Sequence, residues 1–404
     1  MRIYLDHNST TPVHPAVVTA VRTSLEQQFG NASSVHAFGQ DAKTVVDNAR
    51  TSVAELIGAN PQEIVFTSGG TESDNLAIRG VAESAAPTKR LQLITSSIEH
   101  EAVLQTFKAL SKRGWETTLI PVGQGGIVDP DALEAVITDN TALVSIMHAN
   151  NEIGTIQPLA ALADITHRHG ALFHTDAVQS VGKLNIAVAD LDIDLLSLSA
   201  HKFYGPKGVG ALWLRRGSRL ISTLTGGKQE RNRRAGTENV PGIAGLGIAS
   251  RLALQNTAGD AEHLSTLRDK LETGVLQTVP GTVVNGDPSK RISNTTNISF
   301  DRVEAESLLI ALDLEGVAVS TGSACSSGTL EPSHVLRAMG FSAHRAQNSI
   351  RFSLGSDNTS EEIDHVIDIL PKLVQKLRSV SRPSSSPKKQ TAPIGRSVSY
   401  THLR

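Results

Sequence analysis

A lysine follows a long apolar run in the middle of the chain. The run LDIDLLSLS (191–199) leads into Ala200, His201 and Lys202. An ammonium group at the end of a buried strand is costly unless its charge is used or removed, and a Schiff base with an aldehyde removes it. A lone lysine more often extends to solvent. The flanking Ser199 and His201, which could bind a phosphate, favour the reactive amine.

An aspartate stands at the end of a similar apolar run. Asp176 closes the run ALFHTDA (171–177), and Gln179 follows three residues later. A buried carboxylate needs a cationic or proton-donating partner. The nitrogen of a pyridinium ring would serve, and the carboxylate would keep that ring protonated. A capping or salt-bridged aspartate is an equally common interpretation of Asp176 alone.

His100 and Asn151 occupy comparable positions. His100 follows LQLITSS (91–97), and its flat imidazole could stack on an aromatic ring and shuttle protons. A capping or core histidine is the competing interpretation, which His100 alone does not overturn. Asn151, in HANNEIG (148–154), could bind a ring hydroxyl or a substrate carboxylate through its amide.

A glycine pair follows the run EIVFTS (63–68). Gly69, Gly70 and Thr71 precede a helical pattern, so backbone amides and the positive end of a helix could together bind an anion. The Thr71 hydroxyl could donate one more hydrogen bond. A tight turn with Thr71 as helix N-cap is the more common interpretation of such a pattern by itself.

Two residues near the C-terminus could act on a substrate. Cys325 is the only cysteine, so an internal disulfide is excluded, and its surroundings in TGSACSSG (321–328) are typical of a loop, where a thiol can become a reactive thiolate. An inert buried cysteine is the alternative. Arg351, in SIRFSLG (349–355), could bind a carboxylate with its forked guanidinium. A structural ion pair is the competing interpretation of Arg351.

The elements that must position these residues alternate between strands and helices. Apolar β-rich runs at 63–68, 91–97, 141–148, 171–177, 191–199 and 209–214 alternate with helical patterns such as EHEAVLQTFKALSKRG and PLAALADITHRHG. This alternation predicts an α/β fold with a largely parallel sheet between helices. Ligands of such sheets bind outside the carboxyl ends of the strands, which is where these polar residues stand.

The pattern changes after about residue 255. A long helix at 261–279 precedes short strands in TTNISF (295–300) and SIRFSL (349–354), and a helix at 361–380 closes the folded part. We therefore expect a large domain at 15–255 and a smaller α+β domain formed by 1–14 and 256–380. The Ser-, Pro- and Lys-rich segment 381–404 is predicted to be disordered.

Composition and charge exclude several classes of protein. Hydrophobic residues make up 39% of the 404 residues, which is ordinary for a globular protein, and the net charge of -2 does not indicate a nucleic-acid partner. The chain shows neither a signal peptide nor an apolar run long enough to span a membrane. With one cysteine and no signal peptide, a reducing cytoplasm is the expected location.

Ten motifs between about residues 4 and 355 can be compared with those of a known family. They are YLDHNSTTP, FGNASSVH, SGGTESDNLA, SIEHEAV, HANNEIGT, HTDAVQSVGK, SAHKFYGPKGVGAL, GGKQERNRRAGTENV, STGSACSSGTLEPSHVLRAMG and SIRFSLG. In this order the motifs resemble those of the class V aminotransferase superfamily and, within it, the cysteine desulfurases of the nitrogen-fixation and housekeeping bacterial type. His7, Ser9, Ala200 and Asn232 depart slightly from the family pattern.

The resemblance implies a fold-type I homodimer with a seven-stranded sheet and a pyridoxal 5'-phosphate cofactor. Lys202 would bond covalently to the cofactor, Asp176 would pair with its ring nitrogen and His100 would stack on its ring. The implied binding residues are Gln179 and Asn151 on the ring hydroxyl side, Gly70, Thr71, Ser199 and His201 at the phosphate, Thr237 at the phosphate of the neighbouring subunit, and Asn151 and Arg351 at the substrate carboxylate.

The activity implied by the resemblance is the conversion of L-cysteine to L-alanine. Lys202 would act as base and Cys325 would receive the sulfur as a persulfide, for transfer to an acceptor such as an iron–sulfur scaffold protein. No resident metal is implied, since a nascent iron–sulfur cluster would contact Cys325 only transiently. The rival functions are an aminotransferase or a selenocysteine lyase on the same scaffold, and a non-catalytic binding protein.

Overall fold

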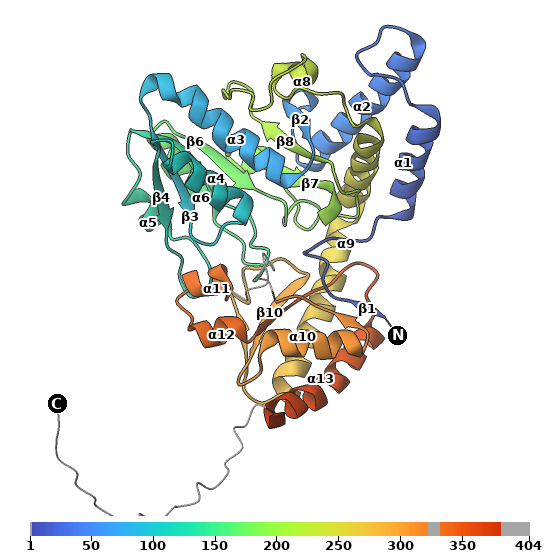
Figure 1. The fold of residues 1–404 in the computed structure, drawn as a ribbon, viewed down its shortest axis with the longest axis vertical. Coiled ribbons are helices and arrows are strands. Elements are labelled where there is room, and N and C mark those ends of the chain that lie inside the picture. The colour runs from blue at the N-terminus through green and yellow to red at the C-terminus, as the bar shows by residue number, and fades with distance from the viewer. Residues whose placement is uncertain (1, 322–331, 381–404) are drawn as a thin grey trace, which may run out of the picture.

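The computed structural model describes residues 2–321 and 332–380 and places them around two main hydrophobic cores. One core surrounds a seven-stranded sheet in the upper part of Figure 1, and the other lies in the lower, orange-to-red part. Cys325 and the predicted disordered segment 381–404 lie outside the described residues. The expected domain limits at 14 and 255 remain a prediction.

The large sheet runs in the strand order β2-β8-β7-β6-β5-β3-β4. Its strands are β2 (Ile64–Thr67), β3 (Gln92–Ser96), β4 (Glu116–Ile120), β5 (Thr141–Ser145), β6 (Leu172–Asp176), β7 (Leu195–Ser199) and β8 (Gly210–Leu214). Only β8 pairs antiparallel with its neighbours in this sheet. The α/β fold with a mainly parallel seven-stranded sheet is therefore confirmed.

Helices cover both faces of the sheet because both faces of its central strands are apolar. Neighbouring strand residues such as Leu195 and Leu196 belong to separate hydrophobic clusters, as the alternation of side chains along a strand requires. Helices α3 (Gly70–Ala85) and α4 (Glu101–Ser111) cover one face, while α2 (Ala37–Leu56) and α6 (Leu159–Arg168) cover the other.

The remaining elements of this part are short or peripheral. They are α1 (Pro15–Gln27), α5 (Pro130–Glu134), α7 (Val188–Leu191), α8 (Gln229–Asn232) and the 3₁₀ turns η1 (Pro61–Glu63), η2 (Ala86–Thr88) and η3 (Ala200–Lys202). Strand β4 was not predicted from the sequence. It is an edge strand with partly exposed side chains, so it lacks the continuous apolar run of its neighbours.

One long helix, α9 (Val240–Thr278), connects the two cores. The sequence predicted its second half as a separate helix at 261–279. The structure instead continues the helix upstream, and the expected limit at 255 falls inside it. Buried residues from Val240 to Ser250 pack in the core of the large sheet, whereas Leu264 to Val275 pack in the smaller core. No residue of the helix between Ser250 and Leu264 is buried, and this exposed stretch hides the continuity of the helix in the sequence.

The lower part of the molecule is built on a three-stranded antiparallel sheet in the order β12-β10-β9. Its elements are β9 (Thr282–Asn285), β10 (Thr295–Phe300), α10 (Ala305–Leu314), β11 (Val317–Ala318), α11 (His334–Ala338), α12 (Ala343–Gln347), β12 (Ser349–Ser353) and α13 (Ser360–Val380). The N-terminal strand β1 (Ile3–Tyr4) pairs in parallel with β11.

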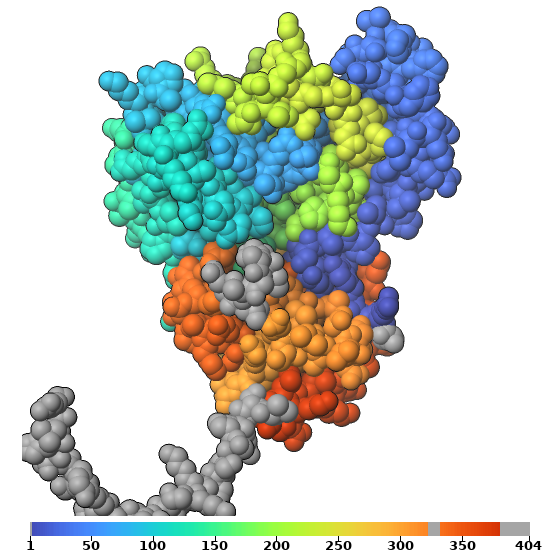
Figure 2. All heavy atoms as spheres, in the orientation of Figure 1, coloured from blue at the N-terminus to red at the C-terminus, as the bar shows by residue number. Residues whose placement is uncertain are grey.

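The N-terminal segment crosses from the lower part of the molecule to the edge of the large sheet. Asp6 forms a bridge to Ser353 beside β12, and the amide of Thr11 donates to the carbonyl of His201 at 2.9 Å. The dark-blue residues therefore lie at the junction of the two parts in Figure 2. No helix within 2–321 and 332–380 is long and apolar enough to cross a membrane. Those residues also hold no group of three His, Cys, Asp or Glu side chains placed to bind a metal ion.

The contact of α2 with α9 predicts that replacing glycine by alanine has opposite effects on stability at two positions of α9. A Cβ at Gly247 would lie 2.7 Å from the backbone Cα of Ala49, whereas a Cβ at Gly259 has no atom within 4 Å. We expect Gly247→Ala to destabilise the protein by about 1–3 kcal/mol through overpacking. Gly259→Ala should stabilise it by about 0.5–1 kcal/mol through helix propensity.

Thermal and urea unfolding of the two variants would measure this difference, and Gly259→Ala is the matched control. Equal stability of the two variants would contradict the close backbone contact between α2 and α9.

Candidate active site

A cavity of about 330 Å³ opens at the carboxyl ends of the central strands. It brings together residues that are far apart in the sequence, and nearly all of the predicted site residues line it. These are Gly70, Thr71, His100, Asn151, Asp176, Gln179, Ser199, His201, Lys202 and Arg351. Their convergence agrees with the rule that ligands of open α/β sheets bind at this edge.

Lys202 ends the short turn η3 that follows β7. Its Nζ donates to the carbonyl oxygens of Asn8 at 2.7 Å and Ser9 at 2.9 Å. Burial and, to a smaller extent, the charge of Arg351 lower the pKa of Lys202 to about 8, against the opposing effects of Asp176 and Asp6. A large fraction of this amine is therefore neutral near pH 8, which suits a nucleophile or base.

The backbone just after Lys202 adopts a conformation that is unusual for a residue with a side chain. Tyr204 has a φ of 65°, in the left-handed region that costs energy for residues other than glycine. Its amide donates to the Thr11 hydroxyl at 2.7 Å, and its own hydroxyl accepts from the amide of Ser356 at 2.7 Å. These bonds hold the turn that carries Lys202.

The methyl group of Ala200 is accommodated by a glycine. Ala200 is fully buried, and its carbonyl accepts from the amides of Phe203 at 3.1 Å and Gly205 at 2.9 Å. A Cβ at Gly205 would lie 2.7 Å from the Cβ of Ala200. The alanine methyl therefore fits because residue 205 has no side chain.

Asp176 lies at the end of β6 and is 5% exposed. Its Oδ1 accepts from the amide of Val178 at 2.9 Å. Burial raises the pKa of Asp176, while the nearby His100 and Lys202 lower it. Within the part of the chain that the structure describes, no side-chain cation forms an ion pair with this carboxyl group. A buried acid without such a partner fits a cationic ring nitrogen.

Two further acids near Asp176 were not predicted from the sequence, and one of them, Asp74, lines the cavity. Asp74 and Glu99 are buried, and their pKa values are raised mainly by burial, that of Glu99 to about 8. Burial also lowers the pKa of His174 to about 3. Glu99 and His174 are thus mostly neutral at pH 7. Of the acids Asp74, Glu99 and Asp176, Asp176 is the one for which nearby cations partly offset the effect of burial on the pKa. Asp176 is therefore the acid best placed to carry a negative charge.

The glycine pair forms the start of α3. Gly69 occupies the N-cap position with a φ of 151°, so the interpretation of Thr71 as N-cap is wrong, and Thr71 is instead the second residue of the helix. A Cβ at Gly70 would lie 2.7 Å from Cγ2 of Val178, and one at Gly69 would lie 3.6 Å from Oγ of Ser199. The first amides of α3 therefore reach the cavity without obstruction, as a phosphate site requires.

His100 and Gln179 each have a structural contact in addition to their place in the cavity. His100 is the N-cap of α4, and its Nδ1 accepts from the amide of Ala102 at 3.1 Å, so the capping interpretation and the cavity position both hold. Gln179 donates from Nε2 to the carbonyl of Asn8 at 2.9 Å and accepts from Lys183 at 2.7 Å. These contacts fix the orientation of the Gln179 amide.

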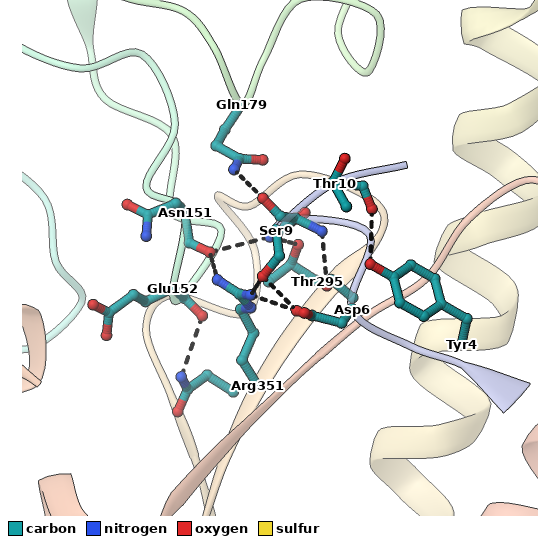
Figure 3. Close-up of polar contacts among 12 residues, drawn as sticks. Tyr4, Asp6, Ser9, Thr10, Asn151, Glu152, Gln179, Thr295 and Arg351 are labelled. Atoms are coloured by element: carbon teal, nitrogen blue, oxygen red, sulfur yellow. Dashed lines mark hydrogen bonds and ion pairs between the residues drawn. The ribbon is translucent and has the colours of Figure 1, made fainter. Parts of the chain in front are cut away.

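Arg351 projects from β12 toward the N-terminal segment, as Figure 3 shows. Its Nη1 donates to the carbonyl of Asn151 at 3.0 Å, and its Nη2 donates to Oδ1 of Asp6 at 2.6 Å and Oγ of Ser9 at 2.8 Å. The interpretation of Arg351 as part of a structural ion pair is thus confirmed, and Arg351 also lines the cavity.

One predicted residue that the structure describes, Thr237, is not brought into this cavity within one chain. Thr237 lines a separate pocket with Ser68 and Arg234, and its contribution to a neighbouring copy remains a prediction. Conversely, Asn8 and Ser9 line the cavity without having been predicted to do so. The polar motif YLDHNSTTP was the available signal, but the periodicity of a sequence does not predict that an N-terminal turn lies beside Lys202.

Comparison with known proteins supports the interpretation of this geometry. The family model described as "Aminotransferase class-V" matches residues 3–366. The chain belongs to the class-V aminotransferase family. It is 50% identical over 379 residues to "Cysteine desulfurase IscS" of Dictyoglomus turgidum, covering 94% of this chain and 96% of that protein. It is also 50% identical to "Cysteine desulfurase IscS" of Methanosarcina thermophila, covering 94% and 93%.

Solved structures of the family have the same fold. A "NIFS-LIKE PROTEIN" is 38% identical with a TM-score of 0.88, over 93% of this chain and all of that one. A structure titled "SspA in complex with cysteine" is 36% identical with a TM-score of 0.78, over 89% of this chain and all of that one. The membership in the class-V family that the motifs predicted is confirmed, and within it the chain is an enzyme of the cysteine desulfurase group.

The lowered pKa of Lys202 predicts unusual reactivity toward amine-specific reagents. The neutral amine reacts, so modification of Lys202 in the protein without cofactor should rise with pH and level off above about pH 8. An ordinary lysine, with a pKa near 10.4, is still gaining reactivity there. Pulsed acetylation followed by peptide mass spectrometry would measure each lysine separately.

The exposed Lys108 provides an internal reference for the intrinsic rate of the reagent. A pH profile of Lys202 that follows that of Lys108 up to pH 10 would show that the cavity does not perturb this amine.

Proposed function

We propose that this enzyme is a cysteine desulfurase that converts L-cysteine to L-alanine and retains the sulfur as a persulfide on Cys325. The observation that carries the proposal is the convergence of Lys202, Asp176 and Arg351 in one cavity. An amine of lowered pKa, a buried acid and a forked cation are what a reaction at the α-carbon of an amino acid needs. The names of the relatives add the sulfur chemistry.

Pyridoxal 5'-phosphate is the cofactor that these residues fit. Lys202 would hold it covalently, Asp176 would pair with its ring nitrogen and His100 would stack on its ring. The first amides of α3, with Thr71, Ser199 and His201, would bind its phosphate, and Asn151 and Gln179 would face its hydroxyl. When bound, the cofactor supplies an electron sink for charge that develops at the substrate α-carbon.

The residues of the chain then have separate roles. Arg351 binds the substrate carboxylate and so orients the α-carbon. Nζ of Lys202 accepts the proton from that carbon, for which its lowered pKa is suited because the neutral amine is present near neutral pH. The cavity that surrounds both residues limits the access of water to the reacting atoms.

The sulfur transfer step needs a second thiol. The Cys325 thiolate attacks the sulfur of the substrate, a sulfur–sulfur bond forms and the carbon–sulfur bond of the substrate breaks. The substrate carbon recovers a proton and leaves as alanine, so the reaction Cys325 thiol plus cysteine gives Cys325 persulfide plus alanine, without an external oxidant. Cys325 enters this proposal from the sequence alone.

Several features of the wider assembly belong to the same proposal. We expect a homodimer in which Thr237 reaches the phosphate of the neighbouring subunit. We expect a sulfur acceptor, such as an iron–sulfur scaffold protein, a tRNA-thiolation enzyme or a protein of a cofactor pathway. A cytoplasmic location and the domain limits at 14 and 255 are also part of it.

A variant lacking the thiol tests the sulfur transfer step. Cys325→Ala should retain cofactor binding and its visible absorbance, because Lys202 and Asp176 are intact. It should lose persulfide formation and alanine release from L-cysteine. Alanine and protein-bound sulfane sulfur would be quantified together. Undiminished alanine release would exclude Cys325 as the attacking group and favour a different activity, such as amino transfer, on this scaffold.

A variant lacking the amine tests the cofactor assignment. Lys202→Ala should lose the covalent bond to the cofactor and its absorbance band, and should reduce turnover of L-cysteine by more than roughly a hundredfold, as removal of an acid–base group does. Lys108→Ala, which removes an exposed amine far along the chain, is the control. Retention of the absorbance band in Lys202→Ala would refute the role of Lys202, and so would attachment of the cofactor to another residue, detected by peptide mass spectrometry after borohydride reduction.

A further inference from the structure

The guanidinium of Arg351 donates three hydrogen bonds within the chain. These bonds limit how many of its N–H donors a ligand can use. A guanidinium has five N–H donors. The contacts to Asp6, Ser9 and the carbonyl of Asn151 use three of them. The Nε of Arg351 is buried and has no hydrogen-bond partner among the described residues. Donors remain on Nε and Nη1, while both hydrogens of Nη2 are occupied.

Asp6 and Ser9 hold Nη2 as a connected pair. The Ser9 hydroxyl donates to Oδ1 of Asp6 at 2.9 Å and accepts from Arg351 at 2.8 Å, so one hydroxyl bridges the carboxylate and the cation. The Asp6 carboxylate, the Ser9 hydroxyl and the Arg351 guanidinium therefore form one connected hydrogen-bonded group.

The backbone fixes the carboxylate of Asp6 relative to Arg351. Asp6 forms a parallel bridge to Ser353, two residues after Arg351 on β12, and residues two apart on a strand share a face. The amide of His7 also donates to the carbonyl of Ser353 at 3.1 Å. Asp6 does not line the cavity, whereas Ser9 does, so Asp6 supports Arg351 from behind.

We propose that Asp6, with the bridging Ser9 hydroxyl, is a positioning residue that orients Arg351 for the carboxylate of the amino-acid substrate. Resting on the proposed function, this inference concerns the recognition of one group of that substrate. Asp6 and Ser9 hold Nη2 of the guanidinium, so a carboxylate that enters the cavity meets an Arg351 whose orientation is already fixed.

The effect of Asp6 should fall on carboxylate binding and spare the chemical step. Asp6→Asn should raise KM for L-cysteine and the dissociation constant for L-alanine by roughly tenfold, the effect of losing about one charge-assisted hydrogen bond. The value of kcat should stay within about twofold. Binding of ethylamine, which resembles alanine without its carboxylate, should be unchanged. A merely structural role would weaken both ligands.

Ser9→Ala provides a milder variant that keeps Asp6 and Arg351. It should raise the same two constants by roughly threefold. In the double variant the two constants should rise by at most about twofold beyond their values in Asp6→Asn. Both residues act on one nitrogen of Arg351, and the effects of neighbouring residues are not additive. The matched control is Asp301→Asn, which removes an aspartate paired with Arg302 at 3.3 Å on the surface.

Calorimetric titration of the cofactor-loaded full chain with L-alanine and with ethylamine, together with steady-state kinetics on L-cysteine, would decide. Unchanged or tighter binding of L-alanine by both Asp6→Asn and Ser9→Ala would overturn the inference, and so would an equal loss of ethylamine binding. A wild-type chain that makes no alanine from cysteine would refute the proposed function instead. The two titrations would still test Asp6 in that case.

Discussion

Two cations line one cavity, and the site depends on how a single short segment holds them. Lys202 donates to the backbone carbonyls of Asn8 and Ser9, and Arg351 donates to the side chains of Asp6 and Ser9. Like charges in a cavity of low dielectric oppose each other, and the charge of Arg351 helps to lower the pKa of Lys202. Carbonyl oxygens stabilise an ammonium without adding a full negative charge. This leaves the amine easy to deprotonate while the guanidinium, paired with a carboxylate, stays charged.

The N-terminal segment can reach both cations only because the two parts of the molecule are fastened together. Strand β1 pairs with β11 in the lower part, and Thr11 bonds to the turn that carries Lys202 in the upper part. Helix α9 runs through both cores. The two cores are therefore joined by one continuous helix, α9, and by the hydrogen-bonded N-terminal segment. The cavity lies where the two cores meet.

Much of the architecture could be predicted because its local signals are strong. Buried strands such as β7 lie in largely apolar runs, and the polar residues after them mark the carboxyl edge of the sheet. Where the signals were weak the predictions failed. Strand β4 is partly exposed, α9 has an exposed stretch between its two buried halves, and Gly69 rather than Thr71 is the N-cap of α3. In each case a tertiary contact decided what a local pattern left ambiguous.

The sequence by itself determined the chemical groups, their order and the α/β pattern, because residue types and periodicity are local properties. Lys202, Asp176 and Arg351 could be named as candidates from their neighbours, and the family resemblance assigned their roles. Only the tertiary structure decided which groups share charge and hydrogen bonds. Asp6 and Arg351 are 345 residues apart, yet their atoms lie 2.6 Å from each other. Such a contact follows from the pairing of strands and the burial of charge, and these depend on the whole chain being folded.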